Sequence, residues 1–438
     1  MSIFTYEIIL ASREFPYLYR MSRKIRTNVA HIMHNEISLG TLPDRACLRA
    51  VKCIYNCRML GLESKFLLDP DICFLNHGSF GATPKPVFLE YQRWQRELEH
   101  QPVEFLGRRH NGLMHASRVA LATYFNTDAE NLVYTQNVTI SVNIVAHSLE
   151  LGPGDEVLAS DHEYGACHRT WRFLAGERGF KYINQPIAVP LISNQKLVED
   201  FWQGVTPRTR LIFLSHITSP TAIRFPVEEI CRRARQAGIL TLIDGAHGPG
   251  QIMLNLPQLG ADFYGGNLHK WLCAPKGAGF LFARPEVQHL LKPLVVSWGY
   301  ESEAPSGSTF VDYYEWWGTR DISAFLSVPA AIEFQGQNDW GTVRKACHGM
   351  LEAVLRGIRK ITGLPSNYPD DSWYVQVAAA PLPREVDTLQ LKSRLYAEYG
   401  VEVPIIDWNQ HKLIRVSIQG YNTPRDTDRL LAALAELL

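Results

Sequence analysis

The 438-residue sequence lacks the features that mark a membrane protein, a nucleic-acid-binding protein or a disulfide-rich secreted protein. No apolar run reaches the roughly 18 residues that a helix needs to span a bilayer. Lys and Arg total 44, and so do Asp and Glu, so we expect neither nucleic acid nor an acidic membrane as the main partner. The eight cysteines show no paired spacing, which predicts free thiols in a reducing, cytoplasmic compartment.

The cysteines also give no pattern of metal ligands. Their one close group, Cys47, Cys53 and Cys57, lacks CxxC spacing and acidic neighbours, so we predict no metal site. What the sequence does contain is the composition of an ordinary globular protein, with 46% hydrophobic and 20% charged residues. Its length predicts two or three structural units.

Residues 1–60 differ from the rest of the chain. They are rich in Arg and Lys and have poor periodicity, which predicts an N-terminal extension that is disordered or loosely attached. A targeting peptide is an alternative, although Glu7, Glu14 and Glu36 argue against a transit sequence. A start at Met59, directly before the well-patterned part, is another.

Short apolar runs alternate with helical patterns between about residues 130 and 285. This alternation predicts a mostly parallel sheet covered by helices on both faces. One helical pattern spans residues 227–238, with Gly238 as its C-cap. The strand candidates are LVYT (132–135), EVLAS (156–160), RLIFLSHI (210–217), LTLIDGA (240–246) and GAGFLFA (277–283).

An earlier helix is predicted to begin with Thr83 as its N-cap and Pro84 at its first position. Its apolar face would carry Val87, Tyr91, Trp94 and Leu98. We predict a large domain over residues 61–320, whose first segment also contributes to the small domain and the active site. A smaller C-terminal domain would span 321–438, with strands near 372–380 and 413–418.

Parallel sheets bind ligands at the carboxyl ends of their strands, so polar residues there are candidates. Asp244 ends a buried run, and a buried carboxylate is costly unless a cation, such as a protonated pyridine nitrogen, pairs with it. Lys270 follows in FYGGNLHKWLCAPKG (263–277), where Phe263, Trp271 and Leu272 would depress its pKa and make it nucleophilic towards aldehydes. The plainer alternatives are a turn-capping aspartate and a solvent-exposed lysine.

A third strand end leads into a helix that starts near Asn137. Backbone N–H groups there, with the Thr139 hydroxyl, would suit a phosphate, and an ordinary N-cap is the alternative. Asn267 and His269 are further possible donors, and Tyr164 could either cover the face of a ring or pack in the core. An anionic partner for a ring, a lysine for an aldehyde and a helix start for a phosphate together predict pyridoxal 5'-phosphate (PLP).

The chain resembles the class V aminotransferase-like group of fold-type I PLP enzymes, and within it the isopenicillin N epimerase-like proteins. The resemblance covers about residues 65–438. It implies an α/β fold, with a large domain whose mostly parallel sheet is flanked by helices and a smaller α+β C-terminal domain. The motifs that carry it are FLNHGSFG (74–81), PVEFLGRR (102–109), DHEYGA (161–166), DGAHGPG (244–250), GNLHKW (266–271), WGTRD (317–321) and RVSIQGYNT (415–423).

The resemblance also implies roles for single residues. Lys270 matches the Schiff-base lysine and Asp244 the partner of the pyridine nitrogen. His247 and Ser219 occupy positions near the cofactor's phenolic oxygen, and Tyr164 occupies the ring-stacking position. The phosphate would contact Val138 through its backbone, Thr139, Asn267 and His269.

The remaining implied contacts concern the substrate and a second subunit. Arg415 matches the arginine that binds the substrate α-carboxylate, for which a planar bidentate fork is well suited. Asn76 and His77 are expected on the substrate side. Gly318 and Thr319 match a phosphate contact supplied by the neighbouring subunit, which implies a homodimer with shared active sites. The resemblance also implies an amino acid as the small-molecule substrate.

The implied activity is that of a PLP-dependent enzyme acting at Cα of an amino acid, with epimerisation as the main prediction. The alternatives are a C–S lyase (a cysteine desulfhydrase or an S-conjugate or sulfoxide β-lyase), an aminotransferase, and a PLP-binding protein without turnover. An epimerase needs a second acid, for which Tyr164, His77 and Tyr300 are candidates. Cysteine desulfurase chemistry is disfavoured, because the stretch 401–417 before and around Arg415 contains no cysteine.

Overall fold

A seven-stranded sheet forms the centre of the part that the computed structural model describes, residues 61–438. The predictions for residues 1–60, including Cys47, Cys53, Cys57 and Met59, lie outside it. Strand β8 runs antiparallel to both its neighbours, and the other pairs are parallel, as expected. In spatial order the strands are β2 (Leu132–Thr135), β8 (Gly279–Ala283), β7 (Phe263–Asn267), β6 (Leu240–Gly245), β5 (Thr209–Ser215), β3 (Glu156–Ser160) and β4 (Lys181–Gln185).

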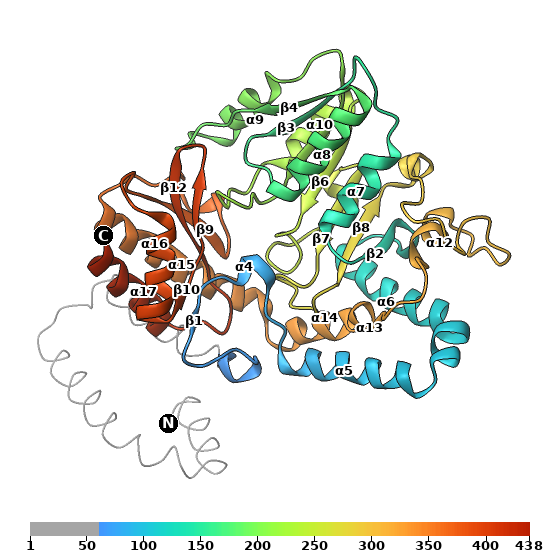
Figure 1. Ribbon diagram of the computed structural model, residues 1–438, viewed down its shortest axis with the longest axis horizontal. Coiled ribbons are helices and arrows are strands. Elements are labelled where there is room, and N and C mark those ends of the chain that lie inside the picture. Colours follow the sequence, from blue (N-terminus) through green and yellow to red (C-terminus); the bar gives the residue numbers. More distant parts are fainter. Residues whose placement is uncertain (1–60) are drawn as a thin grey trace, which may run out of the picture. The chain divides into compact units, whose positions relative to one another are not determined.

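The sheet is covered by helices that follow its strands along the chain (Figure 1). Helix α10 shows why such a segment is helical, because Val227, Ile230 and Ala234 recur at helical spacing and are buried. Its opposite face carries ion pairs such as Arg233 with Glu229. The helices of this part are α7 (Val138–Ser148), α8 (Gly165–Arg178), α9 (Asn194–Trp202), α10 (Val227–Gln236), α11 (Leu256–Leu259) and α12 (Thr309–Glu315).

A second group of helices precedes and follows the sheet. Helix α5 places Val87 in the core and packs Tyr91, Trp94 and Leu98 against it, which confirms the predicted apolar face. The segment Val103–Arg109 is a π-helix. The helices are α4 (His77–Phe80), α5 (Lys85–His100), α6 (His110–Phe125), α13 (Ser323–Leu326), α14 (Val328–Gln337) and α15 (Trp340–Thr362), and the 3-10 turns are Glu63–Lys65, Ala129–Asn131, Pro285–Leu290 and Asp371–Trp373.

Two small sheets accompany the C-terminal segment. An antiparallel sheet has the order β11 (Ile405–Trp408), β12 (His411–Ser417) and β9 (Val377–Leu382), and α16 (Thr388–Tyr399) and α17 (Pro424–Leu437) lie with it in Figure 1. Strand β1 (Cys73–Phe74), far earlier in the chain, pairs with β10 (Val401–Glu402). Helix α4, which follows β1, is therefore anchored to the C-terminal segment.

The sequence predicts most of the strands of the large sheet correctly, but several predicted ends of helices and strands are wrong. Helix α5 begins at Lys85 with Pro84 as its N-cap, because the Thr83 hydroxyl donates to the Ala274 carbonyl instead of capping the helix. Helix α10 ends at Gln236, and Gly238 lies beyond the C-cap with φ of +69°. Strands β4 and β7 were not predicted, and residues 372–376 of the predicted strand near 372–380 lie outside β9.

Within residues 61–438, no helix is long and apolar enough to cross a bilayer. The same residues contain no group of three or more His, Cys, Asp or Glu side chains that could hold a metal ion. The five cysteines of this part are buried and form no disulfide bond with one another.

Candidate active site

A cavity of about 220 Å³ opens where β5, β6 and β7 end, at the carboxyl edge of the parallel strands. Most of its wall comes from the segments that follow these strands and from the starts of α7 and α8. Helix α4 adds the rest from the other end of the chain. The lining residues are Ser79, Phe80, Asn137, Val138, Thr139, Tyr164, Ser215, Ile217, Ser219, Asp244, Ala246, His247, Asn267, His269 and Lys270.

Lys270 lies in this cavity with its Nζ 3.2 Å from Nε2 of His247. Burial, with the nearby charge of Arg415, lowers the pKa of Lys270 to about 8. At pH 7 roughly a tenth of a lysine with this pKa is the free amine, which is the form that reacts with an aldehyde. The apolar neighbours that suggested this pKa are present, because Phe263, Trp271 and Leu272 are all fully buried.

The backbone at Lys270 is held between two glycines that tolerate no side chain. A Cβ on Gly81, which has φ of +70°, would lie 2.0 Å from the His269 carbonyl oxygen and 2.9 Å from the Lys270 Cα. A Cβ on Gly250, with φ of +84°, would lie 2.2 Å from the Trp271 carbonyl oxygen. The glycines of the FLNHGSFG and DGAHGPG motifs therefore allow two segments to close on the lysine from different directions.

Asp244 is the penultimate residue of β6 and lies between Ser215 of β5 and Gly265 of β7. Its Oδ1 accepts a hydrogen bond of 2.8 Å from the Ala246 N–H, but the one donor to its Oδ2 within residues 61–438 is the Cys167 thiol, at 3.5 Å. Burial raises the pKa of this carboxyl, and the charge of Lys270 acts in the opposite direction. A cationic N–H donor in the cavity would satisfy Oδ2 and keep Asp244 ionised.

At the start of α7, Asn137 is the N-cap and its side chain accepts from the Ile140 N–H. The Val138 N–H donates to Oδ1 of Asn267 at 2.9 Å, so this backbone group already has an acceptor. Thr139 lines the cavity at the second helical position, where a helix leaves backbone N–H groups without intrahelical acceptors. His269 lies opposite with Nδ1 3.2 Å from the Ala278 carbonyl oxygen. These groups form an end of the cavity suited to an anion.

Tyr164 lines the cavity and is 47% exposed, so its ring is not core packing. The residue before it, Glu163, is buried and was not predicted as part of the site. Its carboxyl contacts the Ser160 hydroxyl at 2.5 Å and accepts from the Ser215 N–H and hydroxyl at 2.9 and 2.7 Å. Burial raises the pKa of Glu163 to about 8, which favours the neutral acid beside Asp244.

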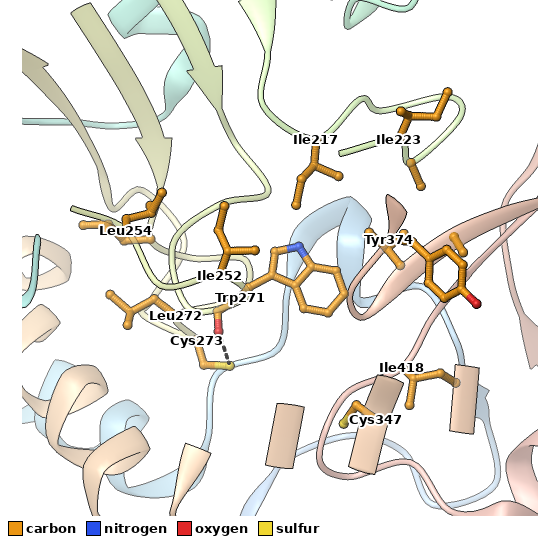
Figure 2. Close-up of a cluster of buried hydrophobic side chains, with 14 of the residues drawn as sticks. Ile217, Ile223, Ile252, Leu254, Trp271, Leu272, Cys273, Cys347, Tyr374 and Ile418 are labelled. Atoms are coloured by element: carbon orange, nitrogen blue, oxygen red, sulfur yellow. Dashed lines mark hydrogen bonds between the residues drawn. The ribbon is translucent and has the colours of Figure 1, made fainter. Parts of the chain in front are cut away.

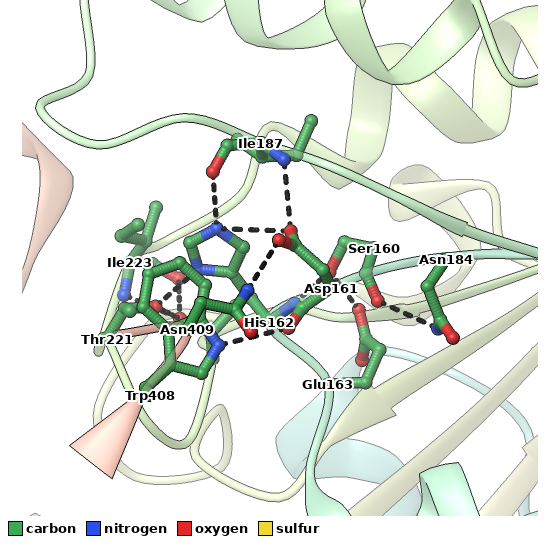
Figure 3. Close-up of polar contacts among 11 residues, drawn as sticks. Ser160, Asp161, His162, Glu163, Asn184, Ile187, Thr221, Ile223, Trp408 and Asn409 are labelled. Carbon is green, nitrogen blue, oxygen red and sulfur yellow. Dashed lines mark hydrogen bonds and ion pairs between the residues drawn. The ribbon is translucent and has the colours of Figure 1, made fainter. Parts of the chain in front are cut away.

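The turn between β11 and β12 is hydrogen-bonded to Asp161, which follows β3 (Figure 3). The Trp408 indole N–H donates to the Asp161 carbonyl at 3.0 Å, and the Asn409 amide donates to the Asp161 carboxylate at 2.7 Å. The His162 ring bridges the Thr221 hydroxyl and the Ile187 carbonyl and lies 4.2 Å from the Trp408 ring. The hairpin whose second strand contains Arg415 is thus anchored to the segment between β3 and α8, which also contains Tyr164.

Arg415 is a buried cation whose guanidinium pairs with no carboxylate of residues 61–438. Its Nη1 donates to the carbonyl and hydroxyl of Ser219 at 2.5 and 3.2 Å, and its Nη2 donates to the Ser79 hydroxyl at 3.1 Å. Burial lowers the pKa of Arg415 to about 10, and the group remains charged at neutral pH. A buried charge without an anionic partner is costly, so this arrangement favours an incoming carboxylate.

Asn76 is linked to this arginine through the hydroxyl of Ser79. Its side chain accepts from the Ser79 hydroxyl at 2.6 Å and donates to Glu402 at 2.9 Å. The chain of hydrogen bonds from Glu402 through Asn76 and Ser79 ends at Arg415. Asn76 therefore orients the arginine instead of lining the cavity.

Several other predicted residues also lie outside the cavity of this chain. His77 is fully buried behind Lys270, between the Tyr421 hydroxyl and the Lys270 carbonyl, each 3.0 Å away. Burial lowers the pKa of His77 to about 3, so it stays neutral. Gly318 and Thr319 lie between α12 and α13, and Tyr300 lies in the segment before α12.

The lining residues fit PLP in three independent respects. Lys270 supplies an amine of lowered pKa, Asp244 has a carboxylate oxygen that lacks a strong donor, and the α7 start with Asn267 and His269 forms an anion-binding end. Tyr164 adds an exposed aromatic face next to these groups. The site thus provides a partner for each reactive part of the cofactor.

Comparison with known proteins agrees with this arrangement. The model of the family "Aminotransferase class-V" matches residues 82–430. The chain belongs to the class V aminotransferase family. This family and the set of donors in the cavity both indicate PLP as the cofactor.

Among class V relatives, isopenicillin N epimerase of Amycolatopsis lactamdurans is 37% identical over 84% of this chain and 96% of its own length. That of Streptomyces clavuligerus is 33% identical over 86% and 97%. An L-cysteine desulfhydrase of Arabidopsis thaliana is 26% identical over 87% and 92%. A solved structure of a C-DES mutant with glycine covalently linked to its PLP cofactor has a TM-score of 0.77 at 21% identity, over 86% of this chain and 99% of that one.

These relatives place the fold among fold-type I PLP enzymes, as predicted. The class V chain described here has no cysteine in the β11–β12 hairpin. The Cys167 thiol contacts Asp244 of the cavity, and burial raises the pKa of that thiol well above its usual range. A buried thiol held protonated is a poor nucleophile.

Proposed function

We propose that this protein is a PLP-dependent enzyme that acts at Cα of an amino acid, with epimerisation as its reaction. The observation that carries the proposal is the placement of Lys270, with its lowered pKa, in one cavity with Asp244. Arg415, which pairs with no carboxylate of residues 61–438, borders this cavity through Ser79 and Ser219. This set binds an amine, a ring cation and a carboxylate. An α-amino acid and the cofactor together present all three.

When bound, PLP stabilises the negative charge that develops at Cα as a proton leaves. Arg415 binds the substrate carboxylate with its fork and so fixes the direction of the Cα–H bond. Lys270 takes the proton with its amine, whose pKa of about 8 suits a general base at physiological pH. Asp244 keeps the ring nitrogen protonated, and Asn267, Thr139 and His269 would hold the phosphate.

Epimerisation needs a second group that delivers a proton from the other side. Of the three candidates from the sequence, only Tyr164 lines the cavity, and its phenol is partly exposed. We therefore propose Tyr164 for this role. The identity of 37% to an epimerase, against 26–28% to L-cysteine desulfhydrases, also favours epimerisation over C–S lyase activity.

We further propose a homodimer in which Gly318 and Thr319 of each subunit complete the neighbour's phosphate site. The exposed segment before α12 favours such a partner, because Val296 and Trp298 are 68% and 78% exposed. Residues 61–320 and 321–438 are proposed as the two domains. The lack of paired cysteine spacing supports a cytoplasmic location.

The test is incubation of PLP-loaded protein with D- and L-amino acids and S-conjugates in deuterated water. We expect deuterium at Cα together with inversion of configuration, and a Tyr164→Phe variant should exchange the proton of one enantiomer but invert poorly. Release of pyruvate with a thiol or sulfide would show that the protein is a C–S lyase and not an epimerase. Binding of amino acids without any exchange would refute both.

A further inference from the structure

His247 has a different partner on each of its ring nitrogens. Its Nδ1 accepts a hydrogen bond of 3.1 Å from the indole N–H of Trp271, and its Nε2 lies 3.2 Å from the Lys270 Nζ. An indole N–H can only donate, so Nδ1 carries no proton. The single proton of the neutral imidazole is therefore on Nε2, which faces the reactive lysine.

We propose that Trp271 is a positioning residue for the reaction: its N–H holds His247 as the Nε2–H tautomer, which presents a hydrogen-bond donor to Lys270. The amine of Lys270 then accepts this hydrogen bond with its lone pair, whereas an ammonium at the same place would face another N–H. The arrangement favours the free amine. The inference rests on the proposed function only in taking Lys270 as the residue that reacts with the cofactor.

His247 stays neutral, because a second proton on its buried ring is disfavoured. The position of its single proton, on Nδ1 or on Nε2, therefore decides what it presents to Lys270. The ring is 2% exposed, and burial together with the charges of Lys270 and Arg415 lowers the pKa of His247 well below its usual range. The other titratable groups that act on His247 or Lys270 are Asp244, Cys167, His77 and His269. Both histidines of this set have lowered pKa values and stay neutral.

The packing around Trp271 keeps the indole where it can donate. The side chain is fully buried in the cluster of Figure 2, and Gln335 donates to its carbonyl oxygen at 2.9 Å. Gly78 leaves room for both rings, because a Cβ there would lie 3.3 Å from His247 Cε1 and 3.6 Å from Trp271 Cζ2. The backbone at Gly78 thus packs directly against both rings.

Not every buried indole N–H of residues 61–438 donates a hydrogen bond. Four other tryptophans have a buried Nε1 without a hydrogen-bond partner within residues 61–438, namely Trp94, Trp171, Trp317 and Trp340. Core packing alone would be satisfied by such an arrangement, or by a phenylalanine. The contact between Trp271 and His247 therefore indicates a role for the N–H itself.

Trp271→Phe removes the N–H and keeps an aromatic ring in the core. His247 then becomes free to adopt the Nδ1–H tautomer, whose Nε2 accepts from a Lys270 ammonium and stabilises the protonated lysine. We measure the rate at which the cofactor-free full-length protein captures pyridoxal 5'-phosphate, followed by absorbance, as a function of pH. The expected midpoint lies near 8 in the unaltered protein and about one pH unit higher in Trp271→Phe, the size of one hydrogen bond to a charged group.

The matched control uses His247→Gln, because an amide can turn either its donor or its acceptor towards Lys270 and has no tautomer to set. We expect the same midpoint in His247→Gln with and without Trp271→Phe. No shift in the single Trp271→Phe variant, or an equal shift in the His247→Gln background, would overturn the inference.

A measurement on the unaltered chain covers the case in which Trp271→Phe does not fold. ¹⁵N NMR of histidine-labelled protein, with the His247 signals assigned by their loss in His247→Gln, should show a protonated Nε2 and an unprotonated Nδ1. A protonated Nδ1 would refute the inference whatever the proposed function. Covalent capture of the cofactor by Lys270→Ala would instead refute the proposed function and leave the NMR result unaffected.

Discussion

Replacing Arg415 with alanine removes a buried guanidinium that no carboxylate of residues 61–438 neutralises. Within residues 61–438 the arginine donates side-chain hydrogen bonds to Ser79 and Ser219. A substrate carboxylate would exchange these neutral partners for a charge-assisted, bidentate pair. Leaving that carboxylate unpaired costs about 2–4 kcal/mol, which corresponds to a rise in Kd of about 30- to 700-fold.

The assay is a titration of the PLP-loaded protein with an amino acid and with the amine that lacks its carboxylate, followed by the change in cofactor absorbance. We expect Arg415→Ala to bind the amino acid more weakly and to bind the amine with unchanged affinity. Ser79→Ala, which removes one of the groups that orient Arg415, should give a smaller loss of the same selectivity. Arg394→Ala, which removes an exposed arginine paired with Glu398, should change neither affinity. Equal losses for the amino acid and the amine would refute a carboxylate-binding role for Arg415.

Glu163→Gln should change the pH dependence of stability, because the raised pKa of Glu163, about 8, makes the native state hold a proton that the unfolded state releases near pH 4.5. The contribution of Glu163 to the free energy of unfolding should thus fall as the pH rises from about 4.5 to 8, and a difference between the unaltered protein and Glu163→Gln that stays constant over this range, measured by urea titration, would contradict this. Gly81→Ala should destabilise the fold by roughly 3 kcal/mol through its clash with His269, whereas Gly363→Ala, also at positive φ but with open space around it, should cost about 1 kcal/mol. Similar melting temperatures for the two glycine variants would show that the segment at Lys270 can move aside.

The sequence was most informative where a residue's role follows from its place at a strand end. Asp244 and Lys270 could be predicted because a parallel sheet gathers the ends of its strands at one edge, and both line one cavity. The antiparallel β8 could also have been inferred. A parallel return needs a crossover, usually a helix, and the connection over residues 268–278 has Pro275, Gly277 and no helical pattern.

Other features depend on contacts that sequence spacing does not encode. Ser79 lies 336 positions before Arg415, and nothing local to Asn76 reveals that it acts through this serine. Glu163 looks like an ordinary polar residue beside Tyr164 until Ser215, 52 positions later, is found to donate to it. His77 was expected near the substrate from its motif, but the structure buries it behind the Lys270 carbonyl.

Borohydride reduction of the PLP-loaded protein followed by peptide mass spectrometry tests the central claim most directly. The reduction converts the link between cofactor and lysine into a stable amine, so the modified residue can be read from the peptide. We predict one phosphopyridoxyl group per chain, on Lys270. A label on Lys276 or any other lysine, or a chain that stays unlabelled after loading, would contradict the account.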